Sequence, residues 1–173
     1  MNLPLLKNDW YVIYTKPRHE KKIVEKLAEL EIENFLPLTK VLRNWHDRKK
    51  YITMPLFPSY VFVRQADIAT IHKVLKIDGV LYFVRIGRNL AVVGDDVIRS
   101  INLFVSSGVN VEVSTRKFDR GRKVIIKDGV FAGLSCEIIN HWGANRVLLR
   151  LIALQCNVVM NWDAAILSEV SVA

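Results

Sequence analysis

The sequence predicts an α+β protein with two domains, an antiparallel sheet with helices followed by a small β-barrel. Up to about residue 105, strand-like and helix-like apolar patterns mix without strict alternation, which is typical of an α+β sandwich. From residue 121 on, four or five short strand-like runs alternate with turn signals, which is typical of a barrel that closes its own edges. We therefore expect domains at 1–106 and 119–173, joined by a small and polar linker at 107–118. Within this linker, residues 109–113 are also compatible with a marginal strand.

The first domain opens on a strand and a helix. Residues 10–14 are β-branched and aromatic, which indicates a buried strand. The apolar residues of 18–30 repeat at helical spacing and the charged ones lie largely outside that stripe, so we expect an amphipathic helix. Thr15 or Lys16 is the expected N-cap, with Pro17 in the first turn.

Turn residues and prolines divide the rest of the first domain. A polar tip at 46–50 between two strand-like runs indicates a hairpin. Two prolines in the run 55–63 lack a ladder donor and suit the start of a strand. Asp95 or Asp96 can cap a third helix. The expected elements are an extended piece at 34–37, strands at 39–45, 51–56 and 55–63, a helix at 68–75, strands at 80–85 and 90–93 around a turn at 87–89, and a helix from 95 to about 105.

Strand-like runs dominate the second domain. One of them, residues 147–154, is also compatible with a helix, because leucine and alanine are good helix formers. The expected strands are at 124–127, 135–140, 146–153 and 157–162.

The basic residues lie mainly in the first part of the chain. The 173 residues carry a net charge of +8, and residues 1–118 hold 19 Lys and Arg against 12 Asp and Glu. Residues 119–173 hold 6 against 5. A basic surface favours a polyanion partner, so we expect any nucleic acid to contact the first domain.

Several classes of protein are not expected from the sequence. No apolar run is long enough to span a membrane and no signal peptide is evident, so we expect a cytoplasmic protein that does not bind membranes. Cys136 and Cys156 are expected to be reduced, and the histidines and cysteines lack metal-ligand spacing. No P-loop, nucleophile elbow or dinucleotide fingerprint is present, so we expect no enzyme activity and no cofactor.

Four segments in order resemble the NusG family of transcription factors. They are WYVIYTKPRHEKKIVEKL (10–27), PLFPSYVFV (55–63), GVLYFVRIG (79–87) and GRKVIIKDGVFAGL (121–134). The resemblance spans about residues 9–170 and implies a NusG-type α/β sandwich followed by a KOW-type β-barrel. PLFPSYVFV and YFVRIGRNLAVV are closer to the specialised antitermination paralogues of the RfaH and UpxY kind. Cys136 departs from the glycine usual at its place in the KOW motif, and RfaH-like proteins tolerate alanine there.

The resemblance implies two contacts with RNA polymerase. In the family, matching aromatic residues partly line a concave apolar patch that grips the clamp helices of the largest subunit, although aromatic residues on strands are also ordinary core. The short helix matches the region that contacts the gate loop of the second-largest subunit in RfaH-like proteins. The implied residues are Tyr14, Phe57, Pro58, Tyr60 and Phe83 for the first contact, and Thr70, Ile71, His72 and Lys73 for the second.

The resemblance also implies contacts with DNA. In RfaH-like proteins the surface around the first helix reads exposed non-template DNA, and the hairpin approaches upstream DNA. Pro17 falls where RfaH has a basic residue, and Arg18 is a substitute one position on. A solvated charged face is the alternative for both groups. The implied residues are Lys16, Arg18, His19, Lys22 and Lys26 at the helix, and Arg43, Arg48, Lys49 and Lys50 at the hairpin.

The expected function is that of a monomeric elongation and antitermination factor that suppresses pausing and termination on particular operons. The barrel is expected to recruit a ribosomal protein or a termination factor. Two alternatives remain open, a general NusG-like elongation factor and a KOW-containing module that binds RNA or the ribosome. In RfaH the second domain can fold as a helical hairpin over the polymerase site, which the helix-compatible run at 147–154 permits but does not require.

Overall fold

The structure is a computed structural model. It describes residues 8–44, 49–65, 67–107, 111–114, 122–126, 135–141, 144–151, 156–161 and 170–172. The chain divides into two compact units, Met1–Asp95 and Asp96–Ala173.

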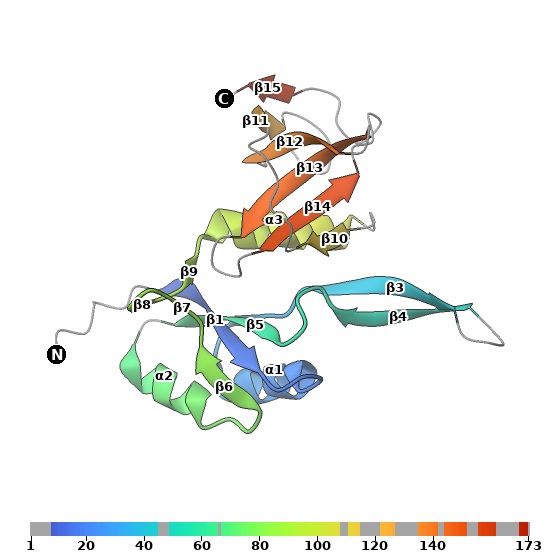
Figure 1. Ribbon diagram of the computed structural model, residues 1–173. Coiled ribbons are helices and arrows are strands. Elements are labelled where there is room, and N and C mark those ends of the chain that lie inside the picture. Colours follow the sequence, from blue (N-terminus) through green and yellow to red (C-terminus); the bar gives the residue numbers. More distant parts are fainter. Residues whose placement is uncertain are drawn as a thin grey trace. The chain divides into compact units, whose positions relative to one another are not determined.

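The first unit is built on an antiparallel sheet with β1 near its centre (Figure 1). The strand order is β2-β5-β1-β6, and β9 also pairs with β1. Residues 10–13 of β1 are buried, which confirms the predicted buried strand. The strands are β1 (Asp9–Thr15), β2 (Asn34–Phe35), β5 (Tyr60–Gln65), β6 (Val80–Phe83) and β9 (Val92–Val93).

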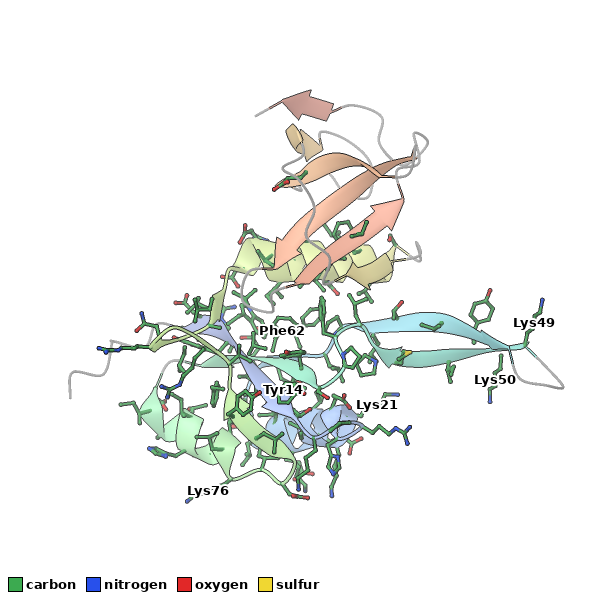
Figure 2. All side chains as sticks on the ribbon, in the orientation of Figure 1. Tyr14, Lys21, Lys49, Lys50, Phe62 and Lys76 are labelled. Atoms are coloured by element: carbon green, nitrogen blue, oxygen red, sulfur yellow. The ribbon has the colours of Figure 1, made fainter. Side chains whose placement is uncertain are left out.

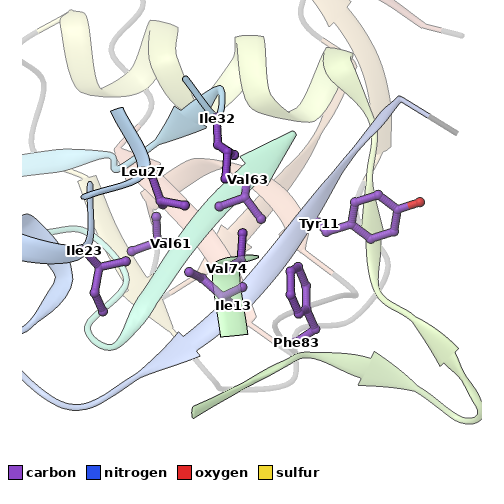
Figure 3. Packing of buried hydrophobic residues seen from close by; sticks show 9 residues of the cluster. All are labelled: Tyr11, Ile13, Ile23, Leu27, Ile32, Val61, Val63, Val74 and Phe83. Carbon is purple, nitrogen blue, oxygen red and sulfur yellow. The ribbon is translucent and has the colours of Figure 1, made fainter. Parts of the chain in front are cut away.

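Helices α1 (Glu20–Glu29) and α2 (Ile68–Leu75) contribute to a hydrophobic core on one face of this sheet. Alternate residues of β1, Tyr11 and Ile13, belong to this core, whereas Val12 points to the opposite face. Figure 3 shows the members of the core, which are Tyr11, Ile13, Ile23, Leu27, Ile32, Val61, Val63, Val74 and Phe83.

The predicted first helix is present, but the predicted cap is wrong. The N-cap residue is His19, and its side chain makes no capping hydrogen bond. Lys16 donates its backbone N–H to the carbonyl of Gly79, and Arg18 adopts a φ of 67°. The chain therefore turns once more after Pro17 before the helix begins, so this proline precedes the first turn.

The predicted strand at 55–63 is interrupted by a turn. Strand β4 (Lys49–Pro55) ends at the first proline, and β5 begins only at Tyr60. The N–H of Tyr60 donates to the carbonyl of Phe57 over 3.2 Å, with Pro58 second in the turn and Ser59 third at a φ of 67°. This is the pattern of a type II turn, in which the third residue needs a positive φ. Glycine or asparagine usually occupies that position, so the serine gave no signal of a turn in the sequence.

Two small hairpins complete the first unit. Strand β3 (Leu38–Asn44) pairs with β4 alone, as the predicted hairpin requires. Strand β7 (Arg85–Ile86) pairs with β8 (Asn89–Leu90) around Gly87, which has a φ of 61°. The predicted strand at 80–85 is divided at Val84: β6 ends at Phe83 and β7 begins at Arg85, while Val84 donates its N–H to the carbonyl of Val12 and its own carbonyl accepts from the N–H of Ala91.

Helix α2 has the predicted bounds, and its N-cap is Asp67. The Asp67 carboxylate accepts a hydrogen bond of 2.6 Å from the backbone N–H of Thr70. This bond is the main cause that holds the pKa of Asp67 below its ordinary value, since it favours the ionised form.

The cap at Asp67 predicts an acid-sensitive contribution to stability. Because the pKa is lower in the folded state, the unfolded chain binds more protons and stability rises with pH. The contribution is present above the ordinary aspartate pKa and is lost as pH falls through the folded pKa. Asp67→Asn keeps an acceptor without a titrating charge. Urea unfolding should show the advantage of Asp67 over asparagine shrinking between neutral pH and strongly acidic pH, and a difference that is constant with pH contradicts this account.

The second unit contains most of helix α3 (Asp95–Ser106) and an antiparallel sheet of six strands. Ile98, Ile101 and Phe104 are buried at helical spacing. Strand β10 lies in the predicted linker, at the place left open for a strand, and pairs with β14. The sheet order is β10 (Val111–Ser114), β14 (Cys156–Asn161), β13 (Ala144–Leu151), β12 (Ser135–His141), β11 (Arg122–Ile126), β15 (Val170–Val172).

The segment with two predicted alternatives, residues 147–154, is a strand as far as the structure describes it. Residues 147–151 belong to β13, which pairs with β12 on one side and β14 on the other. Within the described part of the chain, no helix is long and apolar enough to cross a membrane.

Candidate functional site

Three tyrosines meet on the face of the first sheet opposite the core. Tyr14 stands directly opposite Tyr60 on one neighbouring strand and Tyr82 on the other. The ring of Tyr14 lies 5.1 Å from that of Tyr60 in an edge arrangement and 5.2 Å from that of Tyr82 in a stacked one. We call Tyr14, Tyr60 and Tyr82 the tyrosine cluster. Tyr82 is 52% exposed and the other two are half-buried, so the cluster offers a partner a row of aromatic rings.

Phenylalanines lie on the same face next to the tyrosine cluster. Phe62 is two residues along β5 from Tyr60, and its ring lies 6.0 Å from Phe57 and 5.9 Å from Phe35. Phe57 and Phe62 are fully buried. Phe57, predicted to contact the polymerase, is therefore packed inside the protein in this structure, whereas the neighbouring Pro58 is exposed.

Phe83, the last residue predicted for this patch, belongs to the core instead. It is 5% exposed and stands opposite Ile13, on the side of the sheet that packs with α1 and α2. The residue on the tyrosine face is its neighbour Tyr82, which was not among the predicted contact residues. Strand alternation allows only one of the two on each face. The pairing decides between them: Phe83 stands opposite Ile13 and Tyr82 opposite Tyr14, and the register shifts only beyond this point, between Tyr14 and Thr15.

A buried carboxylate ties helix α1 to the turn beside the tyrosine cluster. Glu20, the first residue of α1, is buried and accepts a hydrogen bond of 2.7 Å from the N–H of Ser59. The carbonyl of Ser59 accepts from the N–H of Thr15 at the end of β1 over 2.9 Å. The turn that precedes Tyr60 is therefore held by the helix start and by the central strand.

Removing this acceptor should destabilise the protein. Glu20→Leu leaves the buried N–H of Ser59 without the carboxylate, and a buried unpaired donor costs about 1–3 kcal/mol of folding free energy. Glu20→Gln retains an amide oxygen in the same place, so its cost should be the smaller of the two. Urea denaturation followed by circular dichroism measures both variants, and equal losses would show that the hydrogen bond is not the cause.

The basic residues around the start of α1 differ in their environments. The Nζ of Lys16 lies 3.6 Å from the carboxylate Oδ1 of Asp78, and the Nζ of Lys26 lies 2.7 Å from the carboxylate Oε2 of Glu29. Arg18 and Lys22 are exposed, and for neither does the structure show an ion pair among the described residues. Exposed Lys21, which was not selected, adds a further positive charge on the same helix (Figure 2).

His19 is half-buried and held in place. Its Nδ1 lies 3.1 Å from the carbonyl oxygen of Pro17. Gly79 lies against the ring at a φ of 96°, and a Cβ there would stand 3.0 Å from the ring. The histidine is therefore positioned before any partner arrives, which suits a residue that recognises a ligand and equally one that closes the turn.

The comparison with protein families decides the family. Residues 8–102, which are 95 of the 173, match the family model described as "Transcription termination factor nusG". The chain belongs to the NusG family. This match covers the sheet, helices α1 and α2, and the tyrosine cluster.

Solved structures of NusG and Spt5 proteins are similar to this member of the NusG family. One concerns domain interaction in Thermotoga maritima NusG, at 21% identity and a TM-score of 0.49, covering 91% of this chain and 94% of that one. Two concern the MjSpt4:Spt5 complex. Conformation A has 13% identity, coverages of 95% and 97%, and a TM-score of 0.28. Conformation B has 14% identity, coverages of 95% and 96%, and a TM-score of 0.29. No curated protein matches.

The second contact implied by the resemblance to the NusG family lies on helix α2. His72 and Lys73 are exposed, whereas Ile71 packs against the core and Thr70 donates its N–H to the cap. The exposed part of this surface is thus the His72–Lys73 pair.

The hairpin residues expected to approach DNA in a NusG-type protein are described in part. Lys49 and Lys50 are exposed on β4 (Figure 2). Arg43 stands opposite Lys50 in the strand pairing, and Arg48 lies outside the described residues. Among the residues that the structure describes, no group of three or more His, Cys, Asp and Glu could hold a metal ion.

Proposed function

We propose that this NusG-family chain is a non-enzymatic transcription elongation factor that binds RNA polymerase through the tyrosine cluster. The observation that supports the proposal is the row of three interacting rings on the face of the sheet opposite helices α1 and α2. Tyrosine is enriched at protein interfaces because its ring buries apolar area while its hydroxyl stays hydrated. Because three adjacent strands hold the rings, little side-chain freedom is lost on binding. The clamp helices of the largest polymerase subunit are the proposed partner.

A second contact would make the first more effective. His72 and Lys73 on α2 are proposed to contact the gate loop of the second-largest subunit. Two modest contacts on one folded unit reinforce each other through effective concentration. Bridging the two sides of the DNA channel disfavours opening of the clamp, and with it pausing and termination.

Basic side chains near α1 are proposed to hold the non-template DNA strand. Arg18 and Lys22 are exposed and available to phosphates, and Lys16 and Lys26 become so by exchanging an acidic neighbour for a phosphate. Each phosphate contact releases counterions and carries no sequence information by itself. His19 is the proposed source of sequence preference, since its ring is already positioned. The lysines of the hairpin are proposed to face upstream DNA.

The second unit is proposed to close into a KOW-type barrel that binds a further partner. The predicted barrel, residues 119–173, holds 6 basic against 5 acidic residues, and this nearly balanced charge favours a ribosomal protein or a termination factor over RNA. We further propose that the chain is a specialised antitermination factor, acting as a monomer on particular operons.

The proposal is tested by retention on purified core RNA polymerase. We expect the full chain to bind in a pull-down, and absence of binding rules the proposed function out. A termination assay with and without a candidate leader sequence then distinguishes a specialised antitermination factor from a general elongation factor. Read-through that depends on the leader supports the specialised role, and the same effect on every template supports a general elongation factor.

A further inference from the structure

Hairpin β3–β4 carries an exposed aromatic ring that neither the core nor the tyrosine cluster uses. Tyr51 on β4 is 67% exposed, the highest value among the large hydrophobic side chains described. The two strands pair only with each other, and the hairpin extends away from the first unit's sheet (Figure 1). A two-stranded ribbon is at best marginally stable by itself. Because the Tyr51 side chain is 67% exposed on this ribbon, it contributes little to the free energy of folding.

The surroundings of Tyr51 are positively charged. The described residues of the hairpin include four basic side chains and no acidic one. Lys49 is two residues before Tyr51 on β4, and Lys40 stands opposite Thr53, two residues after it. Because side chains alternate along a strand and paired residues share a face, these two lysines lie on the face of Tyr51. Both are exposed, and no ion pair is seen for either within the described ranges.

We infer that this face of the hairpin binds single-stranded nucleic acid, with an unpaired base stacked on Tyr51 and phosphates beside Lys40 and Lys49. An aromatic ring between positive charges is the arrangement by which proteins bind single strands without reading sequence. A base in a duplex has both of its faces covered by its neighbours, so the ring favours an unpaired strand. The inference rests on the proposed contact of the hairpin with DNA and adds the residue that stacks and the state of the strand.

The test measures binding of the full chain to fluorescent oligonucleotides by anisotropy, with no polymerase present. The probes are a mixed-sequence single strand without self-pairing and a duplex of the same length. We expect Tyr51→Ala to weaken single-strand binding by about 5- to 150-fold, as for loss of one stacked base. Tyr51→Phe keeps the ring and should stay within about twofold of the unchanged chain.

Ile52→Ala is the matched control, because Ile52 is the next residue, 37% exposed, and faces the other side of the hairpin. It should leave single-strand binding unchanged. Lys49→Ala should lower the slope of log affinity against log salt by about 0.7 on single strands. Circular dichroism verifies that each variant is folded.

Three results overturn the inference. The first is that the unchanged chain fails to bind the single strand. The second is that the unchanged chain binds single strand and duplex equally and that Tyr51→Ala weakens both to the same extent. The third is that Tyr51→Ala binds the single strand as tightly as the unchanged chain does. Polymerase retention is measured separately on the same variants and should not change in Tyr51→Ala. If the unchanged chain binds the single strand but does not bind polymerase, the proposed function is refuted, whereas the stacking role of Tyr51 is still supported.

Discussion

Replacing Tyr60 and Tyr82 together with alanine is expected to weaken binding to core RNA polymerase by about 100-fold or more. Aromatic residues at the centre of an interface commonly contribute about 2 kcal/mol or more each when truncated to alanine. The double variant leaves Tyr14 without the rings that contact it on both sides. Its ring then loses both its binding neighbours and the contacts that fix its orientation. Titration of the immobilised polymerase with labelled protein measures the effect.

Two controls separate binding from folding in this experiment. Leu81→Ala removes an apolar side chain that is 46% exposed on the same strand, next to Tyr82, and leaves all three rings of the tyrosine cluster in place. It should bind polymerase as the unchanged chain does. Tyr60→Phe with Tyr82→Phe keeps the rings and should retain most of the affinity. Retained binding by the double alanine variant, with its circular dichroism unchanged, excludes the tyrosine cluster as the polymerase site.

Elements with a clear period or a strong local signal were predicted well from the sequence. The central strand β1 is apolar and aromatic from Trp10 to Tyr14, and α2 starts at a capping aspartate and has its predicted bounds. The errors fall where the signal is not local. The turn before Tyr60 places serine at a positive φ, and the buried Glu20 that binds its N–H lies 39 residues away in sequence. A pattern read along the chain does not contain that contact.

In the candidate site, too, some residues follow from a local pattern and others only from the tertiary fold. Tyr14 and Tyr60, both predicted for the patch, stand opposite each other on neighbouring strands and so share one face of the sheet. On β6 the period alone could not decide between Tyr82 and Phe83, since the strand has only four residues and pairs through an irregular register. Exposure, which separates a docking ring from a core ring, follows from what packs above each side chain and is fixed only by the tertiary fold.

Phe83→Ala is expected to lower the free energy of unfolding by about 3–5 kcal/mol, the range for truncating a buried phenylalanine. Its ring packs in the core with Ile13 and Val74, so alanine leaves a cavity between the sheet and α2. Urea unfolding followed by circular dichroism measures the loss. Tyr82→Ala, one residue earlier, should cost far less stability because half of that side chain is already in water.

The pair also decides what each residue does in binding. If Phe83 acts only through packing, Phe83→Leu restores most of the stability and leaves polymerase affinity unchanged, because leucine refills much of the space. Tyr82→Leu should instead keep stability and lose affinity. A Phe83→Leu variant that is stable yet fails to bind polymerase would place Phe83 in the interface, and the face of the sheet used for docking would then have to include the side that α2 now covers.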